Sequence, residues 1–472
     1  MPVWSDSHRR QYMGLYNHPD KSYTYPDFMF MDRIGGRYVF TMVTSKTTHI
    51  HTLIVGGGLT GLATAYALEK QGCTDYLVLE KSSRPGGLCA TTFVNGYHFD
   101  YSGHFLHTHT PQGRAIIQKL LGSNLKKHTR QAFIYTYGMQ VPYPFQQNLW
   151  ALYPELRKLV AEELKRISPV KHTPTDFETW CLQSFGYTLY EAFFRPYNEK
   201  LWKRPLRELT CDWCGPFIPA PNRQDMLQSI RRPPATAAGY NAQFYYPKTG
   251  GCGALVKALA SHIKNLQLNA PLTRVDLAHK TAWVNRTKIT FDHLVNTIAL
   301  PDFIQLLDKN QALKQAAKKL VSQPVTVYHL AIARRVEPFH WIYFPDAAQP
   351  FYRVGLESYF SPDSVPAEGT SLFYIELPGL PPATPRTEQK IWEGLRQKEL
   401  VKSDDIKLFS YFQPIPHAYV VFNKQRARIV PAMLRTLEEK DCYCAGRYGR
   451  WEYSFMESSL LQAQELAQRL VK

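Results

Sequence analysis

The sequence predicts an α/β protein: a doubly wound sheet with an inserted helical domain and an antiparallel β-sheet domain. Three observations predict this fold class. Residues 49–80 run through strand, glycine-rich turn, helix and strand, which is the repeating unit of a doubly wound sheet. Residues 111–222 have mostly helical spacing, and residues 321–425 carry short strand-like runs. The 472 residues are 44% hydrophobic and 20% charged, which is typical of a folded chain of two to three domains.

The first element is the apolar run HIHTLIVGGG, which predicts a buried strand ending in glycines. The helix-like LTGLATAYALEKQG follows, and YLVLE predicts the next strand. The glycines at the turn form the motif GxGxxG. Because glycine has no side chain, the backbone there can approach a pyrophosphate at the N-terminus of the helix. Glu80 ends the second strand at the distance that suits ribose hydroxyls, and Gly86-Gly87 follow it in an E-x5-GG pattern.

This combination is typical of large FAD-binding enzymes rather than NAD dehydrogenases, so we predict a Rossmann-like FAD-binding domain. Its predicted cofactor-binding residues are Gly56, Gly58, Thr60, Gly61, Glu80, Arg84, Gly86 and Gly87.

The middle of the chain predicts helices over 151–167 and 176–186, and a Pro/Ala-rich connection over 222–240. A helix over 252–266 and alternating strands over 275–291 then lead into the buried run DHLVNTIAL, which returns to the nucleotide-binding sheet. The C-terminus predicts a strand at DCYCAG and a helix from about Ser454.

These elements predict four parts. They are an N-terminal extension (1–48), an FAD-binding domain (49–110, 241–300 and 426–472), a helical substrate or cap domain (111–240) and an antiparallel sheet substrate domain (301–425). Residues 1–48 show no clear period, and two interpretations remain: a surface extension, or sequence upstream of a start at Met42.

The charge and the cysteine spacing of the chain bear on two questions: whether it binds nucleic acid and whether it holds a metal ion. The net charge of +17 favours anionic partners, but no long basic run exists, so dispersed surface charge is expected and nucleic-acid binding is not. The pairs Cys211/Cys214 and Cys442/Cys444 lack a second CxxC or a His pair at metal-ligand spacing, so no metal site is predicted. Reduced thiols, no apolar stretch of 18 residues and no secretory signal predict a cytoplasmic protein without a transmembrane segment.

Beyond the FAD motifs, four segments carry a resemblance: FDYSGHFLHTH (99–109), VPYPFQQN (141–148), FRPYNEKLW with CDWCGPFIPAPN (194–222), and WIYFPDAAQPFYRVGLESYFSP (341–362). With these and Ala445-Gly446-Arg447-Tyr448, the chain resembles the flavin amine oxidase and protoporphyrinogen oxidase superfamily. Within that superfamily it looks most like the eukaryotic type of UDP-galactopyranose mutase. The resemblance covers nearly all of 49–460.

The resemblance implies a redox-neutral isomerase of cell-surface polysaccharide biosynthesis that interconverts the pyranose and furanose forms of a UDP-sugar. Reduced FAD would be the active cofactor, with its N5 attacking the anomeric carbon and displacing UDP. Arg195 and Arg353 would clamp the leaving diphosphate, and His104 would lie beside the isoalloxazine ring. For each arginine the alternative is a surface or interdomain ion pair.

The resemblance also implies the remaining site residues. Tyr143, Phe145 and Gln146 would hold the uracil, although core packing of the aromatic pair explains them equally. The other substrate-binding residues implied are Asn198, Asn222, Trp341, Tyr343 and Tyr453, and the further cofactor-binding residues are Gly446, Arg447 and Met456. A mobile loop around 197–222 is expected to cover the sugar.

Three departures from the mutase pattern leave alternatives open. The tract Trp451–Met456 lacks a polar insert, a basic residue linked to NAD(P)H reduction is replaced near Tyr135, and Gly250–Gly253 replaces a GGTGG-like string. NAD(P)H as the reductant is therefore open, as is the oligomeric state. The main alternative is an FAD-dependent oxidoreductase of the amine oxidase or protoporphyrinogen oxidase type. A flavin-binding scaffold or redox sensor is the third hypothesis.

Overall fold

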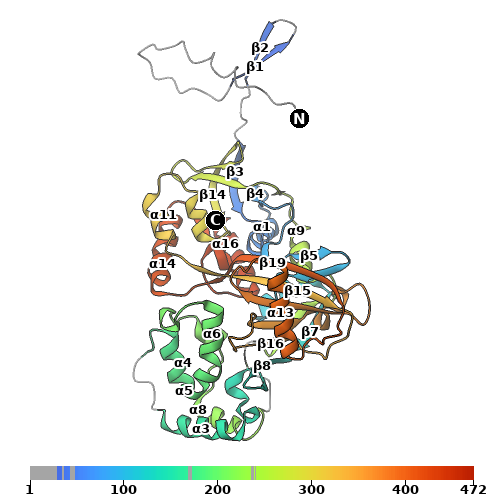
Figure 1. Ribbon diagram of the computed structural model, residues 1–472. Coiled ribbons are helices and arrows are strands. Elements are labelled where there is room, and N and C mark those ends of the chain that lie inside the picture. Colours follow the sequence, from blue (N-terminus) through green and yellow to red (C-terminus); the bar gives the residue numbers. More distant parts are fainter. Residues whose placement is uncertain are drawn as a thin grey trace, which may run out of the picture. The chain divides into compact units, whose positions relative to one another are not determined.

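The computed structural model (Figure 1) describes residues 29–34, 37–42, 48–167, 173–234, 239 and 241–471. The chain divides into two compact units, residues 1–47 and 48–472. In the first unit, strands β1 (Met29–Ile34) and β2 (Arg37–Met42) pair antiparallel, with Met29 opposite Met42. The remainder of the predicted extension lies outside the described residues.

The first large sheet confirms the doubly wound prediction. Its strand order is β11-β4-β3-β14-β13-β12, and β20 pairs with the end of β14. The pairs among β11, β4, β3, β14 and β20 are parallel, and the β12–β13–β14 meander is antiparallel. The strands are β3 (Thr48–Val55), β4 (Tyr76–Leu79), β11 (Leu266–Gln267), β12 (Leu272–Asp276), β13 (Thr281–Val284), β14 (Thr287–Asn296) and β20 (Cys442–Cys444).

Helix α1 (Leu59–Lys70) follows β3 directly and packs against the C-terminal helix α16 (Met456–Leu470). Every residue of α1 from Leu59 to Leu68 is buried, which explains its small side chains: alanine, glycine and threonine let the neighbouring elements approach. The C-terminal helix begins two residues after the predicted Ser454.

The second large sheet has the order β19-β15-β18-β17-β16-β8-β9, antiparallel throughout except for the parallel β16–β8 pair. Ile391, Trp392 and Leu395 of α13 (Pro385–Gln397) cover one face within an apolar cluster. The strands are β8 (Ala132–Thr136), β9 (Met139–Pro142), β15 (Ser322–Ile332), β16 (Trp341–Tyr343), β17 (Arg353–Leu356), β18 (Ser371–Pro378) and β19 (Lys407–Val420).

Figure 1 shows a group of helices set apart from both sheets, drawn in green. The helices predicted over 151–167 and 176–186 are present as α3 (Pro154–Arg166) and α4 (Phe177–Phe185). The others in this region are α5 (Tyr187–Leu189), the π-helical η5 (Tyr190–Phe194), α6 (Arg195–Trp202), α7 (Cys214–Phe217) and α8 (Arg223–Ser229).

Two expectations for this region were wrong. Residues 125–142 are not helical, because Ala132, Ile134 and Thr136 are buried alternately, with a period of two that suits β8. Strand β7 (Leu125–Thr129) pairs across the expected boundary at 240 with β10 (Gln243–Pro247), and the domain division itself stays a prediction. The segment 197–222 is not one loop, since it contains most of α6 and all of α7.

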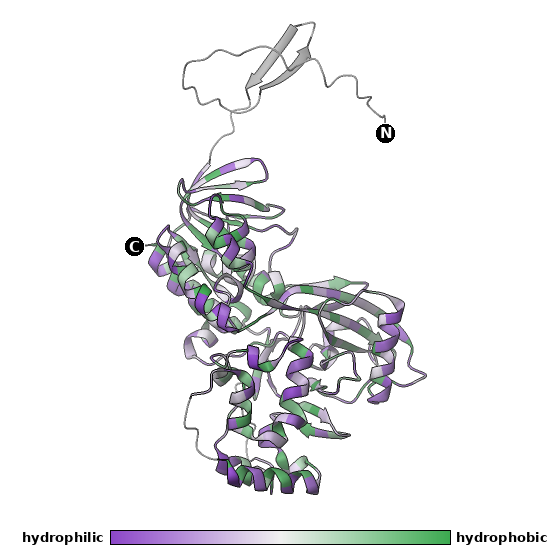
Figure 2. Ribbon diagram, turned by 60° about the vertical axis from the view of Figure 1, so that its left-hand side comes forward, coloured by the Kyte–Doolittle hydropathy of each residue, from purple (hydrophilic) through white to green (hydrophobic). Residues whose placement is uncertain are grey.

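The remaining helices connect and cover the sheets. They are α2 (Pro111–Leu121), α9 (Gly253–Ala260), α10 (Leu300–Gln305), α11 (Gln311–Ala317), α12 (Glu357–Phe360), α14 (Lys424–Glu438) and α15 (Gly446–Gly449). Figure 2 shows hydrophilic and hydrophobic residues interleaved along the helices of the 48–472 unit. Among the described residues, none of the helices has the length and hydropathy that spanning a bilayer would require.

Candidate active site

A cleft of about 930 Å³ lies at the carboxyl ends of β3 and β4 and extends to β16, β17 and the segment before α16. This is the edge of a doubly wound sheet at which ligands bind. Fourteen predicted site residues line it: Gly56, Gly58, Thr60, Glu80, Arg84, Gly86, Gly87, His104, Trp341, Tyr343, Arg353, Arg447, Tyr453 and Met456.

The glycine-rich turn forms one end of the cleft. Gly56 has φ +104°, and a Cβ on Gly61 would lie 1.9 Å from the carbonyl oxygen of Gly56, so only glycine lets α1 begin this close to β3. No side chain caps the N-terminus of α1. Gly58 and Gly86 form an isolated backbone bridge, which brings the second glycine pair to the same helix end. The result is a cradle of backbone amides that suits an anion.

Glu80 sits beside this cradle and is 8% exposed. Its carboxylate accepts hydrogen bonds from the amide nitrogens of Gly57 and Ser82, each at 2.8 Å. The carboxylate therefore holds the turn in shape as well as facing the cleft, and its predicted ribose contact stays a prediction.

Arg353 enters the middle of the cleft from β17. Its guanidinium donates to both carboxylate oxygens of Glu376, through Nε at 2.8 Å and through Nη2. Nη2 also lies 3.3 Å from the hydroxyl of Ser102, which itself donates to Glu376. Because Glu376 is 1% exposed, the bidentate pair fixes where this cation sits.

His104 lies near Arg353 and Arg447. Burial lowers the pKa of its imidazole to about 4, and the charge of Arg447 adds to that effect, so the ring is neutral at pH 7. Its buried Nδ1 has no hydrogen-bond partner among the described residues. An unsatisfied polar atom of this kind fits a bound ligand that supplies the missing partner.

Aromatic rings form the rest of the wall. The Arg447 guanidinium lies over the ring of Tyr453, with 4.2 Å between them, and Tyr453 stacks with Tyr419 at 6.1 Å. Trp341 stacks on Phe105 at 5.2 Å. Burial raises the pKa of the Tyr343 phenol, which keeps its hydroxyl protonated as a donor near Arg353.

The glycine cradle, the orphaned His104 nitrogen and the elongated cleft fit a dinucleotide cofactor such as FAD. Gly56, Gly58, Gly86 and Gly87 would hold its pyrophosphate. Among the residues that the structure describes, no three His, Cys, Asp or Glu side chains form a group that could hold a metal ion.

The structure does not bring Arg195 into the cleft. Arg195 lies at the start of α6, where Nε donates to Glu191 at 2.7 Å and Nη1 lies 3.6 Å from Glu199. This is the ion-pair alternative. Its cause is local, because the two carboxylates stand four residues before and after it on the helix. Arg195 therefore does not line the cleft in this structure, and its part in a diphosphate clamp stays a prediction.

Seven other predicted residues also lie off the cleft wall: Gly61, Tyr143, Phe145, Gln146, Asn198, Asn222 and Gly446. Phe145 is fully buried against Phe193, with ring centroids 5.3 Å apart, so it packs in the core. The Asn222 side chain caps α8 by accepting from the amide of Asp225 at 2.9 Å. Asn198 donates to the carbonyl of Phe194 and Gln146 donates to that of Pro219.

Sequence reasoning missed several cleft residues. Glu376 lies directly opposite Arg353 in the β17–β18 register, and no motif indicated how these two separate strands align. His417 also lines the cleft, with Nε2 3.0 Å from Asp302 and Nδ1 2.7 Å from the hydroxyl of Ser322. These partners are distant in sequence, so no motif indicated them.

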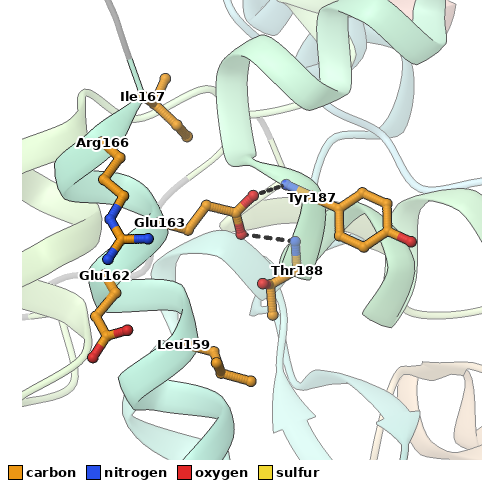
Figure 3. Close-up of a pocket in the computed structure, with 7 residues that line it drawn as sticks. All are labelled: Leu159, Glu162, Glu163, Arg166, Ile167, Tyr187 and Thr188. Carbon is orange, nitrogen blue, oxygen red and sulfur yellow. Dashed lines mark hydrogen bonds between the residues drawn. The ribbon is translucent and has the colours of Figure 1, made fainter.

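A second pocket of about 410 Å³ lies between the end of α3 and the start of α5 (Figure 3). There the carboxylate of Glu163 accepts hydrogen bonds from the backbone amides of Tyr187 and Thr188, the latter at 2.8 Å. Glu163 therefore caps α5 and holds one wall of the pocket, as the dashed lines in Figure 3 mark.

Comparison with known proteins agrees with the geometry. The sequence pattern of the flavin containing amine oxidoreductase family matches residues 59–471. The crystal structure of reduced UDP-galactopyranose mutase superposes with a TM-score of 0.84 at 24% identity, covering 89% of this chain and 94% of the other. A putative protoporphyrinogen oxidase from Exiguobacterium sp. 255-15 gives a TM-score of 0.70 at 17% identity, covering 90% and 99%.

Putrescine oxidase bound to putrescine gives a TM-score of 0.59 at 14% identity, covering 90% of this chain and 99% of that one. At these identities the similarity concerns the fold. An uncharacterized protein in the nifH2 3'region of Methanothermococcus thermolithotrophicus is 50% identical over 52 residues, which are 11% of this chain. That match spans 49% of the relative's length.

Proposed function

The chain belongs to the flavin-containing amine oxidoreductase family, and on that basis we propose that it is an FAD-dependent isomerase of a UDP-sugar. The proposed reaction interconverts the pyranose and furanose forms, with the flavin reduced. Two observations support it: the fold similarity to UDP-galactopyranose mutase over 89% of this chain, and a cleft wall that contains Arg353, Arg447 and several tyrosines.

FAD would lie along the cleft, with its pyrophosphate on the amides at Gly58 and its ribose near Glu80. The reduced flavin would supply the nucleophile that displaces UDP from the sugar. His104, neutral at pH 7, would hydrogen-bond the cofactor through its buried Nδ1 without adding charge.

The single observation that carries the substrate class is the placement of Arg353. Glu376 and Ser102 engage Nε and Nη2, so the guanidinium plane is held still before any ligand arrives. A preoriented cation suits a leaving diphosphate, because little side-chain entropy is lost on binding. Tyr343 and Tyr453 would add hydroxyl donors around the same oxygens.

The FAD-dependent oxidoreductase remains the second candidate, favoured by one specific observation. Arg195 is bound to Glu191 and lies off the cleft wall, so Arg353 has no second arginine of the predicted clamp opposite it. The fold similarity to a putative protoporphyrinogen oxidase is compatible with this alternative. The eukaryotic type, NAD(P)H as reductant and a cytoplasmic location stay predictions.

The test is anaerobic incubation of the full-length protein with dithionite and UDP-galactofuranose, followed by chromatography of the sugar nucleotide. The expected result is UDP-galactopyranose from the reduced protein and none from the oxidised protein. If FAD binds, UDP does not bind and no sugar nucleotide is converted, the isomerase proposal is overturned in favour of the oxidoreductase.

A further inference from the structure

Three sulfur atoms from distant parts of the chain meet at the cofactor end of the cleft. The thiol of Cys89 lies 3.6 Å from the thioether sulfur of Met456, and the thiol of Cys252 lies 3.8 Å from the same atom. Cys89 and Met456 line the cleft, whereas Cys252 is fully buried behind them. We call Cys89, Cys252 and Met456 the sulfur cluster.

The backbone holds the two cysteines together. Cys89 ends the short helix η2 (Gly87–Cys89), and Cys252 immediately precedes α9. The amide of Gly253 donates to the hydroxyl of Thr91 at 2.8 Å, and that hydroxyl donates to Asp100 at 2.6 Å. Asp100 in turn accepts from the amide of Cys252 at 3.1 Å. The segments that follow Cys89 and contain Cys252 are thus tied into one hydrogen-bond network.

Burial and access to the cleft distinguish the two thiols. The pKa of Cys252 is raised well above its ordinary value, first by a hydrogen bond with the thiol of Cys89 and then by burial. Cys89 is 9% exposed and faces the cleft. A reagent in the cleft therefore reaches Cys89 first, and Cys252 stands behind it as a protonated partner.

We propose that Cys89 and Cys252 are a redox-active dithiol that forms a reversible disulfide on reaction with a small disulfide entering the cleft. The Cys89 thiol gives up its proton and its sulfur attacks one sulfur of RSSR, so that the S–S bond of RSSR breaks, a mixed disulfide forms on Cys89 and the departing RS⁻ takes up the proton as RSH. The sulfur of Cys252 then attacks Cys89, its proton leaves with the second RSH, and the Cys89–Cys252 bond closes. Two protein thiols are oxidised and one RSSR is reduced to two RSH.

Burial favours this product over others. A disulfide is neutral, so it places no new charge beside the buried Asp100, whereas a lasting Cys252 thiolate would. The other close pairs differ: Cys211 directs its thiol to the carbonyl of Pro174, and Cys444 contacts Asn296. Among the described cysteines, Cys89 and Cys252 are the only two whose thiols donate to the same acceptor, the sulfur of Met456. One of them, Cys89, also lines the cleft.

The disulfide would act on cofactor binding, a consequence that rests on the proposed function. Gly86, at the start of η2, bridges to Gly58 at the N-terminus of α1, and its amide donates to the carbonyl of Gly57 at 2.7 Å. Bonding η2 to α9 would shift this contact and so deform the pyrophosphate cradle. We expect the oxidised protein to bind FAD at least tenfold more weakly than the reduced protein.

The first experiment maps the bond in the full-length protein. Reduced protein is incubated with oxidised glutathione, quenched with N-ethylmaleimide in denaturant, digested and analysed by mass spectrometry. We expect a linked peptide pair containing Cys89 and Cys252. Cys252→Ser should stop at a glutathione adduct on Cys89, Cys89→Ser should give neither product, and the buried control Cys181→Ser should behave like the wild type.

Recovery of both cysteines as N-ethylmaleimide adducts in wild-type protein would overturn the proposal, as would a link between Cys211 and Cys214 instead. FAD titration of reduced and oxidised wild-type protein, followed by flavin fluorescence, then tests the consequence. Equal FAD affinities of the reduced and the oxidised protein would show that the disulfide does not deform the pyrophosphate cradle. Absence of FAD binding in both states overturns the proposed function, while the mapped disulfide stands independently.

Discussion

Arg353 and Glu376 lie directly opposite each other on adjacent antiparallel strands, and the guanidinium of one binds both carboxylate oxygens of the other. The side chains are 19% and 1% exposed, so the pair is largely removed from water. In such a pair each charge depends on the other, because an unpaired buried charge is costly. The ion pair therefore fixes the position of the Arg353 guanidinium, which the proposed reaction would use to bind the leaving diphosphate.

We predict that Glu376→Leu lowers the free energy of unfolding by about 3–5 kcal/mol, because it leaves Arg353 buried without its partner. The double variant Arg353→Met/Glu376→Leu should recover most of this loss, since it removes both charges. Chemical denaturation of the wild type, both single variants and the double variant gives the interaction free energy between Arg353 and Glu376. Additive losses would show that the pair does not act as a unit.

The same double variant separates binding from folding. We expect it to bind UDP more weakly by about 1.5–3 kcal/mol, roughly a 10- to 150-fold rise in Kd, because a charge-assisted hydrogen bond is lost. Isothermal titration calorimetry measures this. The control is Arg334→Ala, which removes a similar bidentate pair with Asp405, just beyond the ends of β15 and β19 and off the cleft wall. If the double variant binds UDP with the affinity of the wild type, Arg353 is not part of the UDP site.

Gly61→Ala should abolish FAD retention. The added Cβ would lie 1.9 Å from the carbonyl oxygen of Gly56, so the start of α1 must move away from β3. The matched control is Gly215→Ala, where an added Cβ meets no atom within 4 Å. The measurement is the ratio of flavin absorbance to protein absorbance after gel filtration. Equal ratios for the two variants would contradict the tight packing at Gly61.

Glu457 provides a long-range cap for α2 from the first turn of α16. Its carboxylate accepts from the amides of His109 and Thr110, at 2.8 and 2.9 Å, and it is 3% exposed. We predict that Glu457→Ala lowers the free energy of unfolding by roughly 1–3 kcal/mol, because two amide donors at the start of α2 lose their buried acceptor. Gln464→Ala on the same helix, whose side chain makes an exposed contact with Gln112, should cost under about 0.5 kcal/mol.

Stability should fall on acidification from about pH 6.5 to pH 4. Burial lowers the pKa of His128 to about 4, so in this range the unfolded chain binds a proton there that the folded chain excludes. His128 stacks on Phe244 with ring centroids 5.3 Å apart, which makes His128→Phe a conservative test. Denaturation at pH 7 and pH 4 should show a smaller acid loss in the variant, by on the order of 2–3 kcal/mol. An unchanged loss would mean that His128 is protonated in the folded protein.

The sequence alone determined the local parts of this fold. The strand, glycine turn and helix around Gly56–Gly61 follow from hydrophobic spacing and from steric limits on a few adjacent residues, and the structure confirms that unit. The second strand and Glu80 follow for the same reason, since each feature depends on neighbours in the chain. The ion pair of Arg195 with Glu191 is equally local, because four residues separate the two side chains, but the resemblance implied Arg195 in the diphosphate clamp, and Glu191 was not identified as its partner.

Only the tertiary structure decided which distant residues meet. The register that sets Arg353 opposite Glu376 depends on how β17 aligns with β18, and a one-residue slip would send either side chain to the other face. The sulfur cluster joins Cys89, Cys252 and Met456, which no period or motif connects. Such contacts depend on how all the helices and strands pack together in the core. They are therefore set by the whole chain and not by any single segment.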